Sequence, residues 1–68
     1  MDEAKKRVEE ECAELQERLS KLGAFLLSDK VLRLSNEMQH LLGRQHEAMC
    51  TYLWILKQRL EIWDNPST

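Results

Sequence analysis

The feature that most constrains this chain is an apolar belt toward its C-terminal end. Eight of the nine residues from Ala48 to Leu56 are apolar, and Thr51 is the exception. Nine consecutive residues point in every direction around an α-helix, so a helix through this belt is apolar on all sides. The chain has only 68 residues, and chains of that length bury small cores. One neighbouring helix covers only one side of the belt, which would leave a large apolar patch exposed in a monomer.

We therefore predict that copies of the chain pack together through the belt as a homo-oligomer. Six residues are expected at the contact between copies: Met49, Tyr52, Leu53, Trp54, Ile55 and Leu56. The alternative is a small helical adaptor that binds a host protein through the same apolar helix. A closed oligomer in solution favours the first interpretation, and a monomer or an aggregating species favours the second.

The composition predicts an all-α chain with a single domain spanning residues 1–68. Charged residues make up 32% of the sequence and hydrophobic residues 43%, with two Gly and one Pro. Such a composition is typical of long helices, and the length excludes a multidomain enzyme. The longest apolar run is far shorter than the ~20 residues of a membrane span, and no signal-peptide pattern is present. We expect no membrane partner.

Apolar spacing divides the chain into an antiparallel helical hairpin. A first helix is expected at about residues 2–26, a short turn or helix at 29–34, and a long helix at about 36–63. The apolar residues of the first helix recur every three or four positions, as in a single packing stripe: Val8, Cys12, Leu15, Leu19, Leu22 and Leu26.

Several residues mark the ends of these helices. Asn36 with Gln39 fits a capping box at the start of the second helix. Asn65-Pro66 is expected to end it. Gly23 lies in the last turn of the first helix, where Gly is less favourable than Ala, and indicates a kink or the close approach of another backbone.

The charge of the chain is uneven. Residues 1–17 hold seven acidic and three basic residues, a net of −4, whereas residues 18–68 hold five acidic and seven basic residues, a net of +2. The total of −2 argues against a long nucleic acid as partner. A small anion can still bind a local basic site in the second part of the chain.

Basic residues accompany aromatic residues on the second helix. Arg44, Lys57 and Arg59 share it with Tyr52, Trp54 and Trp63. Guanidinium groups bind phosphate, and aromatic faces stack on bases. In a monomer these are ordinary surface charges and core aromatics. In a symmetric oligomer, a two-fold or three-fold axis repeats each basic residue and matches the repeated phosphates of a cyclic di- or trinucleotide.

Other chemistry has little support. His46 and Cys50 are four residues apart on one helix face, but a zinc site needs about four ligands at recognisable spacings. Cys12 and Cys50 fall opposite each other in the expected hairpin, and we expect both to be reduced core thiols. No nucleophile is placed with a base and an orienting acid. We predict no catalytic site, no metal and no cofactor.

The stretch from Glu17 to Trp63 resembles the helical hairpin of small phage proteins that counter CBASS and, in related members, Thoeris immunity. Three motifs carry the resemblance: E-R-L-x-K-L-x-x-F-L, L-L-x-x-Q-x-x-A-M and Y-L-x-I-L-x-x-R-L. It implies a homo-oligomer, typically a hexamer, in the cytoplasm of an infected bacterial host. Such a protein acts as a sponge that sequesters cyclic oligonucleotide signals without cleaving them, so that the CBASS effector is not activated.

The resemblance also implies two kinds of pocket between protomers. Cyclic dinucleotides would lie against a first-helix Lys, for which Lys21 is the nearest match and Ser20 the alternative register. An aromatic residue near the N-terminus completes this pocket in the family, but here no aromatic precedes Phe25. Cyclic trinucleotides would lie against an Arg and a Thr repeated about a three-fold axis, for which Arg44 and Thr51 are the counterparts. Lys57 and Arg59 are expected to neutralise further phosphate charge.

Overall fold

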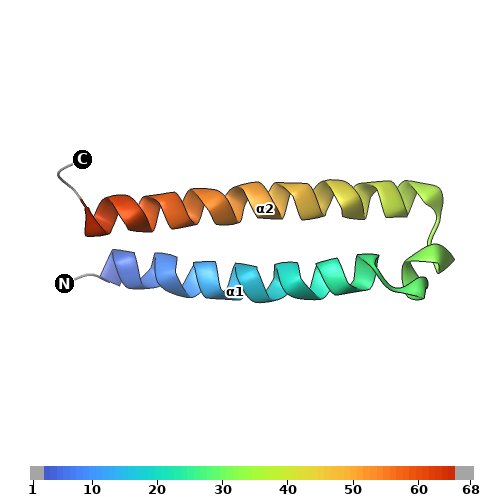
Figure 1. Ribbon diagram of the computed structural model, residues 1–68, viewed down its shortest axis with the longest axis horizontal. Coiled ribbons are helices and arrows are strands. Elements are labelled where there is room, and N and C mark those ends of the chain that lie inside the picture. The colour runs from blue at the N-terminus through green and yellow to red at the C-terminus, as the bar shows by residue number, and fades with distance from the viewer. Residues whose placement is uncertain (1–2, 66–68) are drawn as a thin grey trace.

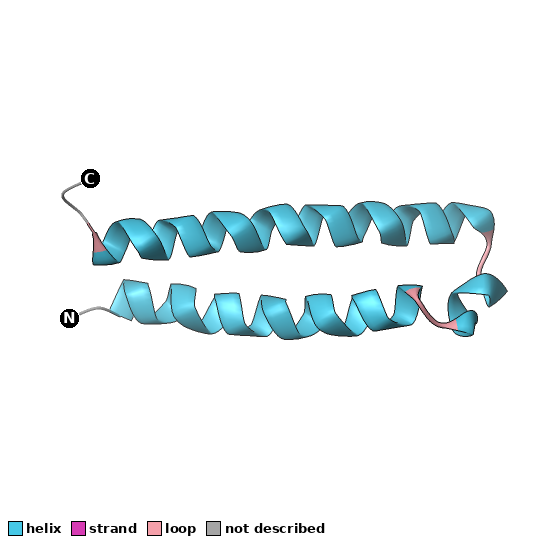
Figure 2. Ribbon diagram, viewed as in Figure 1, coloured by secondary structure: helices cyan, strands magenta, loops and turns pink. Residues whose placement is uncertain are grey.

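The structure, a computed structural model, describes residues 3–65 as an antiparallel hairpin of two long helices (Figure 1). Helix α1 (Glu3–Leu26) and helix α2 (Asn36–Asp64) lie side by side, and a 3₁₀ helix, η1 (Asp29–Arg33), joins them. Every regular element of the described residues is helical (Figure 2). The predicted all-α hairpin with a short middle segment is confirmed, and the homo-oligomer stays a prediction.

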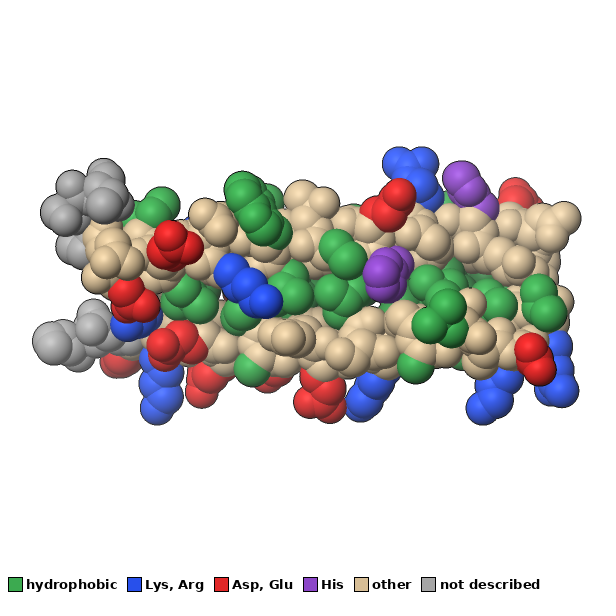
Figure 3. Space-filling model, in the orientation of Figure 1, with side chains coloured by type: hydrophobic (Ala, Val, Ile, Leu, Met, Phe, Trp, Pro, Cys, Tyr) green, Lys and Arg blue, Asp and Glu red, His purple; other side chains and the backbone are tan. Residues whose placement is uncertain are grey.

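The core lies in one half of the hairpin. Val8, Cys12 and Leu15 of α1 pack with Leu53 and Leu56 of α2. Leu56 has no exposed surface, and Leu19, Met49 and Leu60 extend the cluster as partly buried neighbours. On the face shown in Figure 3, apolar side chains follow the line where the two helices meet, whereas charged side chains line the outer edge of α1. The predicted stripe of α1 is thus the side that packs, although its last two residues, Leu22 and Leu26, are only half-buried.

The cap of α2 differs from the predicted capping box. Ser35, not Asn36, is the N-cap residue, and its hydroxyl accepts a hydrogen bond from the Met38 backbone N–H at 3.1 Å. The Gln39 side chain donates to the Leu34 carbonyl at 2.9 Å, which stabilises the entry to the helix in another way. Asn65 ends α2, with its backbone N–H bonded to the Glu61 carbonyl, and Pro66 lies outside the described residues.

Gly23 does not interrupt α1, which continues to Leu26. A Cβ placed on Gly23 would lie 3.5 Å from Nε2 of His46, an ordinary van der Waals distance. The neighbour is a side chain of α2, not a second backbone. The chain then leaves α1 through Ser28, whose hydroxyl donates to the Phe25 carbonyl at 2.7 Å and caps η1 by accepting from the Lys30 N–H.

Two polar contacts join the helices beside the core. Nζ of Lys5 lies 2.6 Å from a carboxylate oxygen of Asp64 at the open end of the hairpin. Nearer the middle, the Tyr52 hydroxyl donates to the carboxylate of Glu11. This hydrogen bond is the main reason why the pKa of Tyr52 is raised; desolvation and the negative charge of Glu11 add to it, and the positive charge of Arg59 opposes it.

Truncating Leu56 tests the core. Leu56→Ala should lower the free energy of unfolding by about 2–5 kcal/mol, since it leaves a cavity where the side chain is fully buried. Urea unfolding followed by circular dichroism, at one fixed chain concentration, measures the loss. Leu27 is 90% exposed, so Leu27→Ala is the matched control and should change stability by less than about 0.5 kcal/mol. Equal losses in the two variants would contradict this core.

The Tyr52–Glu11 bond gives a pH dependence. Because folding raises the pKa of Tyr52 above its usual value of 10.0, the bond's contribution is complete below pH 10 and is lost as pH rises through the raised pKa. Tyr52→Phe removes the titrating group. The difference in melting temperature between the wild type and Tyr52→Phe should therefore be constant between neutral pH and pH 10 and shrink above pH 10. A difference that stays constant in alkaline solution would refute the bond.

Candidate functional site

An apolar stripe on α2 faces away from α1. We call Leu41, Ala48, Ile55 and Ile62 the outer stripe. Each residue of the stripe is seven positions from the next, so the four lie almost on one line along the helix. All four are exposed, Leu41 to 61% and Ile62 to 65%. Apolar residues at a sustained seven-residue spacing are typical of a helix that packs against another helix, and α1 covers a different side.

Polar residues alternate with the outer stripe. Three polar residues each follow a stripe residue by three positions: Arg44, Thr51 and Gln58. Together with the outer stripe they give the three-and-four spacing of a helix-packing face, which we call the seam. Arg44 and Thr51 are exposed, and both contact residue Glu47. Nε of Arg44 lies 3.9 Å from a Glu47 carboxylate oxygen, and the Thr51 hydroxyl donates to the Glu47 carbonyl at 3.2 Å. The Arg–Thr pair therefore shares one exposed face with the outer stripe.

The other predicted ligand residues lie elsewhere. Lys21 is on α1, where its Nζ is 3.2 Å from a carboxylate oxygen of Glu17 in an exposed pair. Lys57 and Arg59 are both exposed, but a separation of two residues turns their side chains about 200° apart around α2. Arg44 and Thr51 are thus the pair placed in one line along α2, and Arg59, four residues after Ile55, borders the same face, whereas Lys57 points elsewhere.

The six residues predicted at the contact between copies divide into two groups. Leu53 and Leu56 are buried inside the hairpin against α1, and Met49 packs beside them, so these three belong to the core of the single chain. Tyr52, Trp54 and Ile55 are exposed, and Trp54 exposes 62% of its surface. This second group, together with the exposed part of Met49, is available to a second copy in this conformation.

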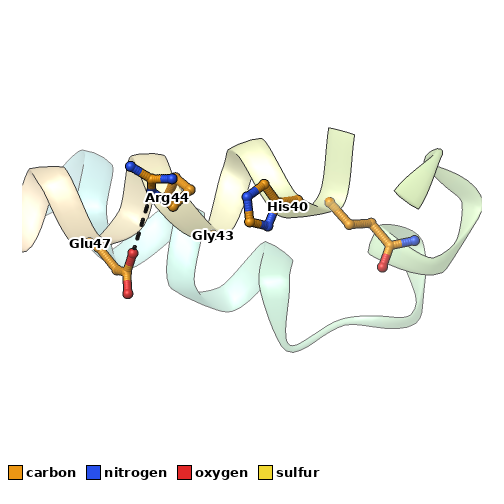
Figure 4. Close-up of a pocket in the computed structure, with 5 residues that line it drawn as sticks. His40, Gly43, Arg44 and Glu47 are labelled. Atoms are coloured by element: carbon orange, nitrogen blue, oxygen red, sulfur yellow. Dashed lines mark ion pairs between the residues drawn. The ribbon is translucent and has the colours of Figure 1, made fainter. Parts of the chain in front are cut away.

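A shallow hollow of about 340 Å³ lies on α2 beside the seam. Its floor is Gly43, and its walls are Gln39, His40, Arg44 and Glu47. Figure 4 shows His40 and Arg44 on either side of Gly43, with Glu47 paired to Arg44. Of these five residues, sequence reasoning selected only Arg44 for a ligand site. The available signal was Gly43 itself, because Gly inside a long helix is unfavourable without a local reason.

The two cysteines differ in burial, although the predicted pairing placed both in the core. Cys12 is buried in the core, whereas Cys50 is exposed, with its Sγ 3.8 Å from Nδ1 of His46; both are free thiols. The prediction that both thiols pack in the core is wrong for Cys50. Within residues 3–65, no group of three or more His, Cys, Asp or Glu side chains is arranged to hold a metal ion.

None of the helices in the described part of the chain is both long enough and apolar enough to cross a bilayer.

Comparison with known proteins gives one family assignment. The family model described as Sequestin matches residues 2–62 of the chain. Neither the curated proteins nor the solved structures give a significant match.

Proposed function

This chain belongs to the Sequestin family, and from that membership we propose that it sequesters cyclic oligonucleotides. The family name denotes sequestration, which is the action of a sponge. The proposed ligands are cyclic di- and trinucleotide immune signals. The protein would hold them without cleavage in the cytoplasm of a phage-infected bacterium, so that the CBASS effector is not activated.

The observation that carries this proposal is the position of Arg44 and Thr51 on the exposed face of α2, in line with the outer stripe. A second copy that covers the stripe brings its own Arg–Thr pair to the same seam. Around a symmetry axis these pairs form a ring of guanidinium and hydroxyl donors. Guanidinium donors bind phosphate oxygens in bidentate fashion, so a ring of them suits a cyclic ligand with one phosphate per nucleotide.

The assembly we propose is a hexamer. A hexamer that combines two-fold and three-fold axes repeats a side chain twice at one kind of site and three times at another. Those repeats correspond to the symmetries of cyclic dinucleotides and cyclic trinucleotides. The outer stripe, with Trp54 beside it, supports this assembly because the hairpin itself leaves these side chains uncovered.

The remaining basic residues would serve further phosphate contacts. Lys21 pairs with Glu17 only through an exposed contact four residues apart along α1, which contributes about 0.2–0.5 kcal/mol. That interaction is weak enough for a phosphate to displace, so Lys21 is the proposed cation of a dinucleotide pocket. Lys57 and Arg59 face different sides of α2 and would reach ligands bound at different contacts between copies.

The second candidate function is an adaptor that binds a host protein through α2. It rests on the same uncovered outer stripe, because a stripe of this spacing also fits a helix of another protein. The mass of the purified chain in solution separates the two. A closed oligomer already covers the stripe and supports the sponge, whereas a stable monomer supports the adaptor.

Calorimetric titration with a panel of cyclic di- and trinucleotides tests the sponge. We expect binding by the assembled wild type and recovery of intact nucleotide afterwards. Arg44→Ala should weaken trinucleotide binding about tenfold or more, since a hydrogen bond to a charged group contributes about 1.5–3 kcal/mol. Arg18→Ala removes an exposed α1 guanidinium and is the matched control. Absence of heat with every nucleotide, or cleavage of the ligand, would refute the proposal.

Assembly through the outer stripe is tested by solution mass. Ile55→Asp places a charge in the middle of the stripe and should dissociate the oligomer, because central interface residues contribute about 2 kcal/mol or more. Leu32→Asp, at an exposed leucine of η1, is the control and should leave the mass unchanged. Circular dichroism confirms that both variants remain helical. An unchanged mass for Ile55→Asp would contradict this contact.

A further inference from the structure

Within the hairpin, alanine would fit at position 43 as well as the glycine that is present. It lies inside α2, and its φ is not positive. A Cβ added there meets no atom within 4 Å. Gly in a helix interior is less favourable than Ala by roughly the largest margin of any residue except Pro. The fold of the single chain therefore gives no reason for a glycine at this position.

The other helical glycine provides a contrast. Gly23 faces α2, where an added Cβ would make an ordinary contact with the His46 ring. It belongs to the contact between the two helices, whereas Gly43 opens toward solvent. Both glycines lie in α-helices, and they differ in whether another side chain lies next to the position of an added Cβ.

The walls of the hollow at Gly43 are all polar. Gln39 and Glu47 stand four residues before and after Gly43, so they border it along the helix axis, while His40 and Arg44, three residues before it and one after it, both lie on one side of it around the helix. This set contains an amide, a carboxylate, an imidazole and a guanidinium, and no large apolar side chain. Close packing of a second helix relies on apolar contact around a small residue, which this hollow does not offer.

The mixed lining suits a nucleobase better than a bare phosphate. A base is flat and uncharged, and its edge carries both donors and acceptors, which amide and carboxylate groups can satisfy. Imidazole and guanidinium groups at the rim can also donate hydrogen bonds to the acceptor atoms of a base edge. A phosphate in the hollow would be repelled by the carboxylate of Glu47, whereas Arg44 can meet a phosphate on the seam side.

We propose that Gly43 keeps the α2 backbone bare as the floor on which a nucleobase of the bound ligand lies. His40 and Arg44 border the base on one side, and Gln39 and Glu47 bond to its edge from the two ends of the hollow. The inference rests on the proposed function and adds a base subsite to it. Any side chain at position 43 would lift the base from the backbone.

The two glycines provide a matched experiment. Gly43→Ala and Gly23→Ala should each raise the melting temperature by a few degrees, up to about 4–8 °C, because both replace Gly in a helix. Titration with the same cyclic di- and trinucleotides should then separate them. Gly43→Ala should bind about tenfold more weakly or worse, whereas Gly23→Ala should bind as the wild type does. Solution mass is measured for both variants.

Each other result overturns the inference in a distinguishable way. Wild-type affinity in Gly43→Ala would refute the base subsite and leave the sponge in place. Weaker binding together with a lower oligomer mass would make Gly43 a contact between copies. Absence of binding by the wild type and by Gly23→Ala would refute the proposed function, and the subsite with it.

Discussion

The rest of the structure depends on the unequal width of the two apolar surfaces that meet in the hairpin. Helix α1 offers one narrow stripe, in which Val8, Cys12 and Leu15 are buried, and acidic and basic residues occupy its other sides. Helix α2 carries apolar residues around its whole circumference near Leu53. The stripe of α1 can cover only one side of α2, and that side contains Leu53 and Leu56. The outer stripe is the part of α2 that remains, so the exposed apolar face follows directly from the packing of the core.

Sequence periodicity predicted the hairpin well and its details less well. The three-and-four spacing of α1 identifies the side that packs, because a regular spacing specifies a face. The apolar belt of α2 has no such spacing over its nine residues, so Leu53 could not be distinguished from Trp54 before the packing was known. The cap of α2 was misassigned because Ser35 and Asn36 are adjacent residues of equally suitable type. The choice between them depends on backbone angles that neither side chain determines alone.

In the candidate site, too, sequence spacing explains the positions of some residues, whereas others could be interpreted only from the packed structure. The family resemblance paired Arg44 with Thr51, and their spacing of seven explains why the structure places both on one exposed helix face; their contact with a ligand stays a prediction. Lys57 and Arg59 have equally suitable types, but their spacing of two turns them apart. Gly43 was visible in the sequence only as an unfavourable residue in a helix. The role of a helical glycine depends on which atoms a Cβ at that position would contact, and this is a property of the packed structure. A Cβ at Gly23 would contact His46, whereas a Cβ at Gly43 would point into open space.

Because Arg44 and Thr51 share a face with the outer stripe, ligand binding and assembly are coupled in the proposed function. A ring of donors exists only when copies have joined, so a ligand that binds the ring also stabilises the joined state by mass action. Among residues 3–65, the buried core of one chain comprises five residues along half of the hairpin, which is a small source of stability for a chain of 68 residues. Covering the outer stripe adds apolar burial that the single chain lacks. In the proposed sponge, no separate stable monomer would be needed, since the surface that would complete its core would also create its binding sites.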